Sequence, residues 1–89
     1  MATYLITYDL NNETTRPPIL EKIKEFSWAM LSESSYAINT TMTATEVYDF
    51  LKPLLDGDDT LYIITLGRPY TGFGPPEVND WLEALLPPL

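Results

Sequence analysis

Alternating apolar and polar positions near the N-terminus predict a first β-strand over residues 3–9. This segment, TYLITYD, is rich in aromatic and β-branched residues, and the turn-forming stretch LNNETTRPP follows it. In a strand, Tyr4, Ile6 and Tyr8 point to one side, and the residues between them point to the other. The first strand is therefore expected to end at Asp9.

Helical periodicity then appears twice in the following part of the chain. The first helix is expected to begin at the pair Pro17–Pro18 with Thr15 as its cap, because the first turn of a helix tolerates proline. Its apolar stripe is Ile19, Leu20, Ile23 and Phe26. The second helix is expected after a capping box at residues 43–46, and Pro53 should shorten its last turn. Its stripe is Val47, Phe50, Leu51, Leu54 and Leu55.

Period-two segments and a third helical stripe complete the pattern. Residues 27–41 predict a hairpin of two short strands with a polar turn at residues 32–35. Residues 61–66 (LYIITL) are apolar on both faces, which predicts an inner strand buried from both sides. A loop at 67–76 and a C-terminal helix at 77–86 follow, and the helix has an apolar stripe of Val78, Trp81, Leu82, Leu85 and Leu86.

This order of elements predicts an α+β fold. It is the ferredoxin-like βαββαβ arrangement with a four-stranded antiparallel sheet, here followed by a C-terminal helix. We expect one domain over residues 1–89, with its core in residues 3–66 and with the first and fourth strands paired at the centre. Two helices can cover one face of the sheet, which leaves the other face to the tail or to a second copy of the chain.

Composition restricts the chemistry that such a domain can perform. The 89 residues contain no cysteine and no histidine, which excludes disulfides, thiolate zinc sites and nucleophiles activated by histidine. The net charge of −8 disfavours a broad basic face for duplex DNA. No apolar run approaches the ~18 residues of a membrane span and no secretion signal is visible, so a cytoplasmic protein is expected.

Asp9 is the strongest candidate for a functional carboxylate, because it ends a strand near the middle of the predicted sheet. On a two-fold dimer, the Asp9 side chains of two subunits could hold Mg²⁺, which takes one or two carboxylates and keeps most of its waters. The alternative is that Asp9 only bonds turn amides at the strand end. Asp56, Asp58 and Asp59 lack the spacing of a calcium loop and predict a solvated turn.

Cations and aromatic residues offer a second possible site. Candidate nucleic-acid contacts are Arg16, Lys22, Lys24 and Arg68, which could hold phosphates if they gathered near the first strand; otherwise they are scattered solvated charges. Candidate platforms for stacked bases are Tyr8, Trp28, Tyr36 and Tyr48, for which packing in the core or in a dimer interface is the alternative. The segment Gly72-Phe73-Gly74 is interpreted as part of a proline-bounded loop rather than a phosphate loop.

Two segments resemble a known superfamily. The first strand, closing on Tyr8-Asp9-Leu10, is similar to the one in the CRISPR-associated Cas-two proteins. The run YAINT followed by Thr43-Ala44-x-Glu46 resembles the SinR-like small proteins and the antitoxin GhoS, which belong with the VapD toxins to the same ferredoxin-fold group. The resemblance covers roughly residues 3–66. It implies a homodimer and, in the Cas-two branch, a metal-dependent nuclease in which the aspartates matched by Asp9 face each other.

Two functions remain open at this point, and a metal-free RNA-binding role that does not use Asp9 lies between them. One is a homodimeric, non-catalytic interaction protein of the accessory or antitoxin type, belonging to a prokaryotic or phage defence or mobile element, with a protein partner. The other is an Mg²⁺-dependent single-stranded RNA endoribonuclease that uses Asp9 from both subunits. The fold resemblance favours the nuclease, and the acidic charge favours the interaction protein.

Overall fold

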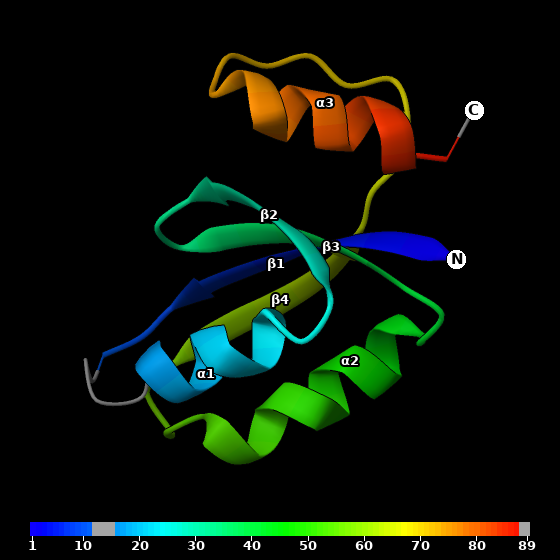
Figure 1. The fold of residues 1–89 in the computed structure, drawn as a ribbon. Helices are drawn as coiled ribbons and strands as arrows, with labels where there is room; N and C mark the ends of the chain where they lie inside the picture. The colour runs from blue at the N-terminus through cyan, green and yellow to red at the C-terminus, as the bar shows by residue number, and fades with distance from the viewer. Residues whose placement is uncertain (12–15, 88–89) are drawn as a thin grey trace.

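A computed structural model of the chain describes residues 1–11 and 16–87 (Figure 1). Its elements are β1 (Ala2–Asp9), α1 (Arg16–Ile23), β2 (Ser27–Ser32), β3 (Ser35–Thr40), α2 (Ala44–Leu51), a 3₁₀ turn (Lys52–Leu54), β4 (Thr60–Thr65) and α3 (Pro76–Leu85). The predicted order of strands and helices is thus confirmed. The cap predicted at Thr15 lies outside the described residues.

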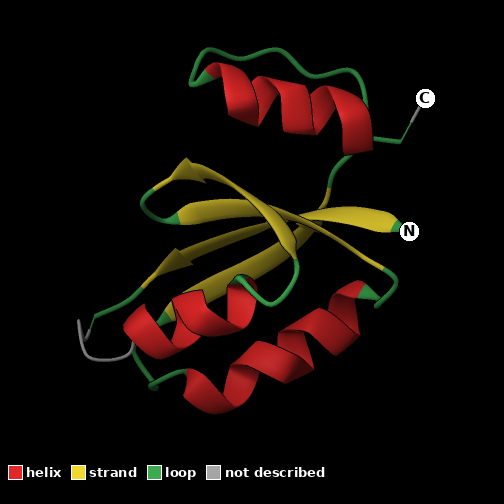
Figure 2. Ribbon diagram, in the orientation of Figure 1, coloured by secondary structure: helices red, strands yellow, loops and turns green. Residues whose placement is uncertain are grey.

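The four strands form one antiparallel sheet in the order β2-β3-β1-β4, which is the ferredoxin-like arrangement (Figure 2). Strand β1 lies in the interior and pairs along its length with both neighbours: Leu5, for example, stands opposite Ala37 of β3 and Ile64 of β4. The chain therefore has the predicted α+β fold.

The main core lies between one face of the sheet and the helices α1 and α2, which Figure 2 shows together on that face. Alternate residues of β1 point into it, and Ile6 is fully buried. The buried members of this core are Tyr4, Ile6, Tyr8, Leu10, Ile19, Ile23, Tyr36, Ile38, Val47 and Leu51. The apolar stripes predicted for the first two helices thus point into the sheet.

The second helix has the predicted local signals at both ends. The Thr43 hydroxyl accepts from the Glu46 amide at 3.1 Å, and the Thr43 amide donates to the Glu46 carboxylate at 2.8 Å. This capping box satisfies amides that have no partner within the helix. At the other end, α2 tightens into the 3₁₀ turn that contains Pro53, as expected from the missing amide of proline.

Helix α3 packs on the opposite face of the sheet from α1 and α2 (Figure 1). Leu82 and Leu86 form a second small core with Ala37 of β3, and the Trp81 indole donates to the Ser27 hydroxyl at 3.3 Å. The Thr3 hydroxyl of β1 donates to the Leu85 carbonyl at 2.9 Å. The tail helix therefore covers the part of this face that belongs to β2, β3 and the start of β1. Within the described residues, no helix is long and apolar enough to cross a membrane.

The prediction that residues 61–66 form an inner strand buried from both sides is wrong. Strand β4 lies at the edge of the sheet, and the centre is formed by β1 with β3 rather than by β1 with β4. Tyr62 is 62% exposed and Ile64 is 49% exposed, because α3 covers the other half of their face. A strand with apolar residues on both faces can thus lie at the edge of the sheet, here with one of its apolar faces exposed within the monomer.

The buried Tyr8 hydroxyl is expected to make the stability of the fold depend on pH. It donates to the Glu33 carbonyl at 2.7 Å. Burial raises its pKa above the ordinary value of 10.0, with further contributions from Tyr36 and Glu33 and partial opposition from Arg16. The folded state therefore favours the neutral phenol, and this stabilisation is fully present below pH 10 and is lost as the pH rises through the higher pKa of the folded state.

We expect Tyr8→Phe to lower the free energy of unfolding by about 1 kcal/mol at neutral pH, through loss of this hydrogen bond. Above pH 10 the difference between variant and wild type should shrink, which urea unfolding at several pH values would measure. Tyr48→Phe, on the surface of α2, is the control and should leave stability unchanged at neutral pH. A difference that stayed constant with pH would contradict the assigned role of the Tyr8 hydroxyl.

Candidate functional site

Asp9 is the last residue of β1 and is exposed, opposite Thr60 of β4. It belongs to the alternate set of β1 residues that points away from α1 and α2. The carboxylate therefore lies at the end of an interior strand, as predicted, on the side of the sheet that α3 only partly covers.

The acidic turn after α2 lies close to the end of β1. The Asp59 carboxylate in this turn accepts hydrogen bonds from backbone amides. Asp59 accepts from the Asn11 amide at 2.9 Å and from the Asp56 amide at 2.8 Å. The Asn11 side-chain amide donates to the Asp58 carbonyl. These bonds are typical of aspartate and asparagine in turns. Among residues 1–11 and 16–87, no group of three or more acidic side chains could hold a metal ion.

Three of the predicted nucleic-acid cations lie on α1 or just beyond its end, and each stands over an aromatic ring. The Arg16 guanidinium carbon is 6.0 Å from the centre of the Tyr8 ring, and the Lys22 ammonium is 4.5 Å from that of Phe50. The Lys24 ammonium is 5.0 Å from the centre of the Trp28 ring. Such contacts contribute up to about 1 kcal/mol at exposed sites.

The fourth predicted cation, Arg68, lies with α3 on the other side of the sheet. It forms an ion pair with Glu83 at 3.2 Å, and its guanidinium also donates to the carbonyls of Glu83 and Leu86. These bonds tie the segment after β4 to the end of α3. The four cations are therefore divided between two sides of the sheet and do not form one basic surface.

The predicted aromatic platforms divide in a similar way. Tyr8 and Tyr36 are buried in the main core, while Trp28 is 40% exposed and Tyr48 is 37% exposed on a different element. The Trp28 and Tyr36 rings pack together, with centroids 5.7 Å apart. Only Trp28 thus combines an exposed ring with a neighbouring cation among these four aromatics.

An exposed apolar area lies on β4, on the face that α3 covers only in part. Tyr62 stands opposite Thr7 of β1, and Ile64 stands opposite Leu5, all on the face that α3 leaves open. We call Leu5, Thr7, Tyr62 and Ile64 the β4 patch. The apolar character of both faces of LYIITL indicated that this face needs a cover, and the sequence left open whether the tail or a second copy of the chain supplies it.

The outer edge of β4 is available for further strand pairing. The Leu66 amide donates to the Thr3 carbonyl at 2.8 Å, so every second residue before it directs its backbone groups toward β1. Leu61, Ile63 and Thr65 therefore direct theirs outward. Residues 60–66 include no charged residue and no proline, the two residue types that commonly block pairing at a sheet edge.

Comparison with known proteins gives a fold and no function. No protein-family model matches the chain, and no curated protein matches it. Among solved structures, the chain is similar to the hypothetical protein TT1823 from Thermus thermophilus, with 22% sequence identity and a TM-score of 0.67. The match covers 83% of this chain and 94% of that chain. At this level of identity, the likeness shows a shared fold alone.

Proposed function

We propose that the protein is a homodimeric, non-catalytic interaction module whose two subunits join through β4. The observation that carries this proposal is the combination of the β4 patch with an uncharged strand edge that can pair. The setting implied by the resemblance is an accessory or antitoxin-type protein of a prokaryotic or phage defence or mobile element.

Strand geometry restricts how two copies can pair. Around a two-fold axis normal to the sheet, two antiparallel β4 strands exchange hydrogen bonds through their outward residues, Leu61, Ile63 and Thr65. The register that uses the whole strand puts Ile63 on the axis and makes about six backbone hydrogen bonds. Tyr62 then stands opposite Ile64 of the partner subunit, and aromatic and β-branched residues form favourable cross-strand pairs.

The charge of the chain sets the conditions under which this dimer forms. Each subunit carries a net charge of −8, so two copies repel each other, while the β4 patch itself is uncharged. Added salt screens this repulsion and leaves the apolar contact in place. Because edge pairing of a short strand buries less than a standard interface, the dissociation constant is expected in the micromolar range.

The same dimer bears on the nuclease alternative. Asp9 stands opposite Thr60, at one end of the paired strands. Three inter-strand steps of about 4.8 Å and an offset of roughly 20 Å along the strands separate the two Asp9 residues by about 25 Å. Ligands of Mg²⁺ lie at about 2.1 Å from the ion. Two Asp9 carboxylates could not share one ion in this arrangement, so the proposed dimer favours a non-catalytic role.

We expect the wild-type chain to form a dimer whose dissociation constant falls with added salt, measured by sedimentation equilibrium. Ile64→Lys should abolish the dimer, because it puts two like charges next to the two-fold axis. Met30→Lys, at a similarly exposed position on β2, is the matched control and should dimerise like wild type, with circular dichroism checking that both variants fold. A wild-type chain that stayed monomeric at ~1 mM, or an Ile64→Lys variant that still dimerised, would refute the β4 interface.

Asp9→Asn separates the two functions that the sequence leaves open. We expect neither the wild type nor the variant to cleave labelled single-stranded RNA in the presence of Mg²⁺, and both to dimerise equally. Cleavage by the wild type that disappears in the variant would overturn the non-catalytic proposal and support the nuclease.

A further inference from the structure

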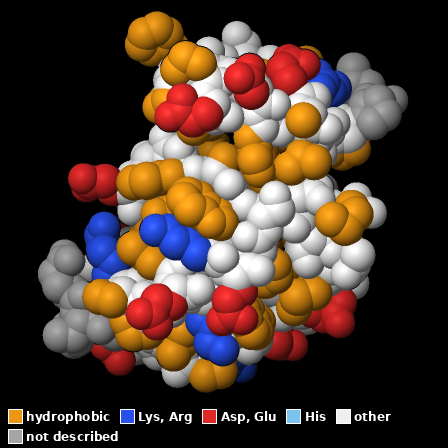
Figure 3. All heavy atoms as spheres, in the orientation of Figure 1, with side chains coloured by type: hydrophobic (Ala, Val, Ile, Leu, Met, Phe, Trp, Pro, Cys, Tyr) orange, Lys and Arg blue, Asp and Glu red, His pale blue; other side chains and the backbone are white. Residues whose placement is uncertain are grey.

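An apolar depression lies at the other edge of the sheet from the β4 patch, between β2 and α3. Its volume is about 450 Å³. The lining residues are Trp28, Ala29 and Met30 from β2, and Pro75, Glu77, Val78 and Trp81 from α3 and the residue before it. We call this depression the β2 groove. Figure 3 shows hydrophobic side chains gathered where α3 meets the sheet.

The backbone of β2 directs free hydrogen-bonding groups to this edge. The Tyr8 amide donates to the Ser34 carbonyl, so even-numbered residues of β3 bond to β1 and odd-numbered residues bond to β2. Ala29 stands opposite Ala37 and therefore bonds to β3. Trp28 and Met30, on either side of Ala29, direct their amides and carbonyls away from the sheet. An added strand would find two residues with which to pair.

We propose that the β2 groove binds an extended segment of a partner protein as an added antiparallel strand, with an apolar side chain in the groove and a basic side chain beside Glu77. The inference rests on the proposed function, since it names the class of partner that the interaction module recognises. It uses the other edge of the sheet, so it is independent of the dimer interface.

The pattern of side chains in such a segment follows from the strand register. A residue opposite Ala29 points to the α3 face, where Ala29, Val78 and Trp81 line the groove. Residues opposite Trp28 and Met30 point to the other face, toward α1. The bound segment should therefore have a large apolar residue at the centre, with its neighbours directed away from the groove.

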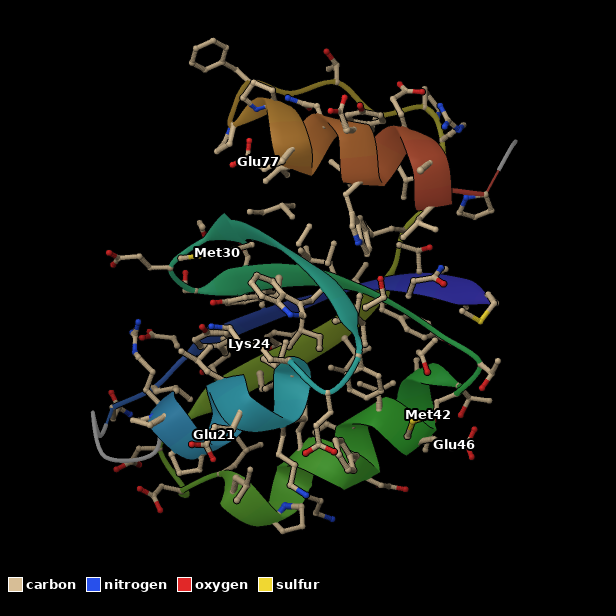
Figure 4. All side chains as sticks on the ribbon, viewed as in Figure 1. Glu21, Lys24, Met30, Met42, Glu46 and Glu77 are labelled. Atoms are coloured by element: carbon tan, nitrogen blue, oxygen red, sulfur yellow. The ribbon has the colours of Figure 1, made fainter. Side chains whose placement is uncertain are left out.

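The two sides of the β2 edge carry charges of opposite sign, which indicate the charges expected on the bound segment. Figure 4 shows Met30 on β2 between Glu77 on the α3 side and Lys24 on the α1 side. Glu77 is exposed, and Lys24 stands 5.0 Å over the Trp28 ring. The segment is thus expected to be basic on the face toward α3 and neutral or acidic on the face toward α1. The net charge of −8 attracts a basic partner over a longer range.

A second copy of this chain fits the groove less well than such a segment. Two-fold pairing of two β2 strands would put both α3 helices on the same face of the joined sheet. Each α3 carries Glu77, Asp80 and Glu83, of which Glu83 is paired with Arg68. The Glu77 carboxylates of the two copies, each lining its own groove, would then lie on the same face of the joint as like charges. A basic segment would instead bring positive charge next to Glu77, which attracts it.

The test uses a synthetic peptide with blocked ends and about eight residues, long enough for one strand. Valine and leucine alternate with threonine, and a lysine stands two residues before the central leucine on the same face, which in the antiparallel register puts it at the Leu31 end of β2, the end near Glu77. We expect saturable binding to the full chain by calorimetry. Glu77→Lys should weaken it about tenfold, whereas Asp49→Lys, the same charge change at an exposed position on α2, should change it less than twofold. A peptide with N-methylated backbone amides on the residues that pair with Trp28 and Met30 should fail to bind.

Hydrogen exchange followed by NMR gives the position of the peptide. The amides of Trp28 and Met30 should exchange more slowly with the peptide bound, and those of Leu61 and Ile63 should be unaffected by it. The Ile64→Lys variant should bind the peptide as wild type does, so failure of the dimer and failure of the groove are separate results. Absence of binding at ~1 mM, insensitivity to Glu77→Lys or to N-methylation, or protection of Trp28 and Met30 by protein concentration alone would overturn the inference.

Discussion

Both faces of this four-stranded sheet carry apolar residues, and the described part of the chain has three α-helices with which to cover them. Helices α1 and α2 together cover one face. Helix α3 is alone on the other, and a helix about 10 Å wide cannot cover four strands that span roughly 15 Å between their outer axes. Because Trp81, Leu82 and Leu86 attach α3 to β2 and β3, the open strip of this face belongs to β4. The β4 patch follows from this incomplete coverage.

Local signals in the sequence predicted the elements well, and strand order was harder. The capping box at Thr43 and the shortened turn at Pro53 depend on residues only a few positions apart, so the sequence contains the whole interaction. Whether β4 lies inside the sheet or at its edge depends on pairing between distant segments. The apolar character of Tyr62 and Ile64 indicates that this face avoids water, and it does not say whether the covering element comes from the same chain.

In the candidate site, too, local features could be predicted from the sequence, and contacts between distant residues could not. Asp9 ends a predicted strand, so its position could be anticipated from the sequence. The positions of the cations could not, because each is held by a partner that only the fold brings close: Lys22 by Phe50, and Arg68 by Glu83. Both contacts occupy cations that sequence reasoning considered available for phosphates.

The two open edges of the sheet differ in ways that suit different roles. Strand β4 is regular and uncharged, and lacks the devices by which natural sheets block edge pairing, so a second copy paired there would cover an edge that is otherwise prone to aggregation. Strand β2 is interrupted by an irregularity between Met30 and Ser32 and has charges of opposite sign on its two sides, which limit what can pair with it. Pairing of like edges around a two-fold axis closes at two copies, whereas pairing of β4 with β2 would continue without end. Assigning β4 to a second copy and β2 to a different partner therefore gives a finite assembly.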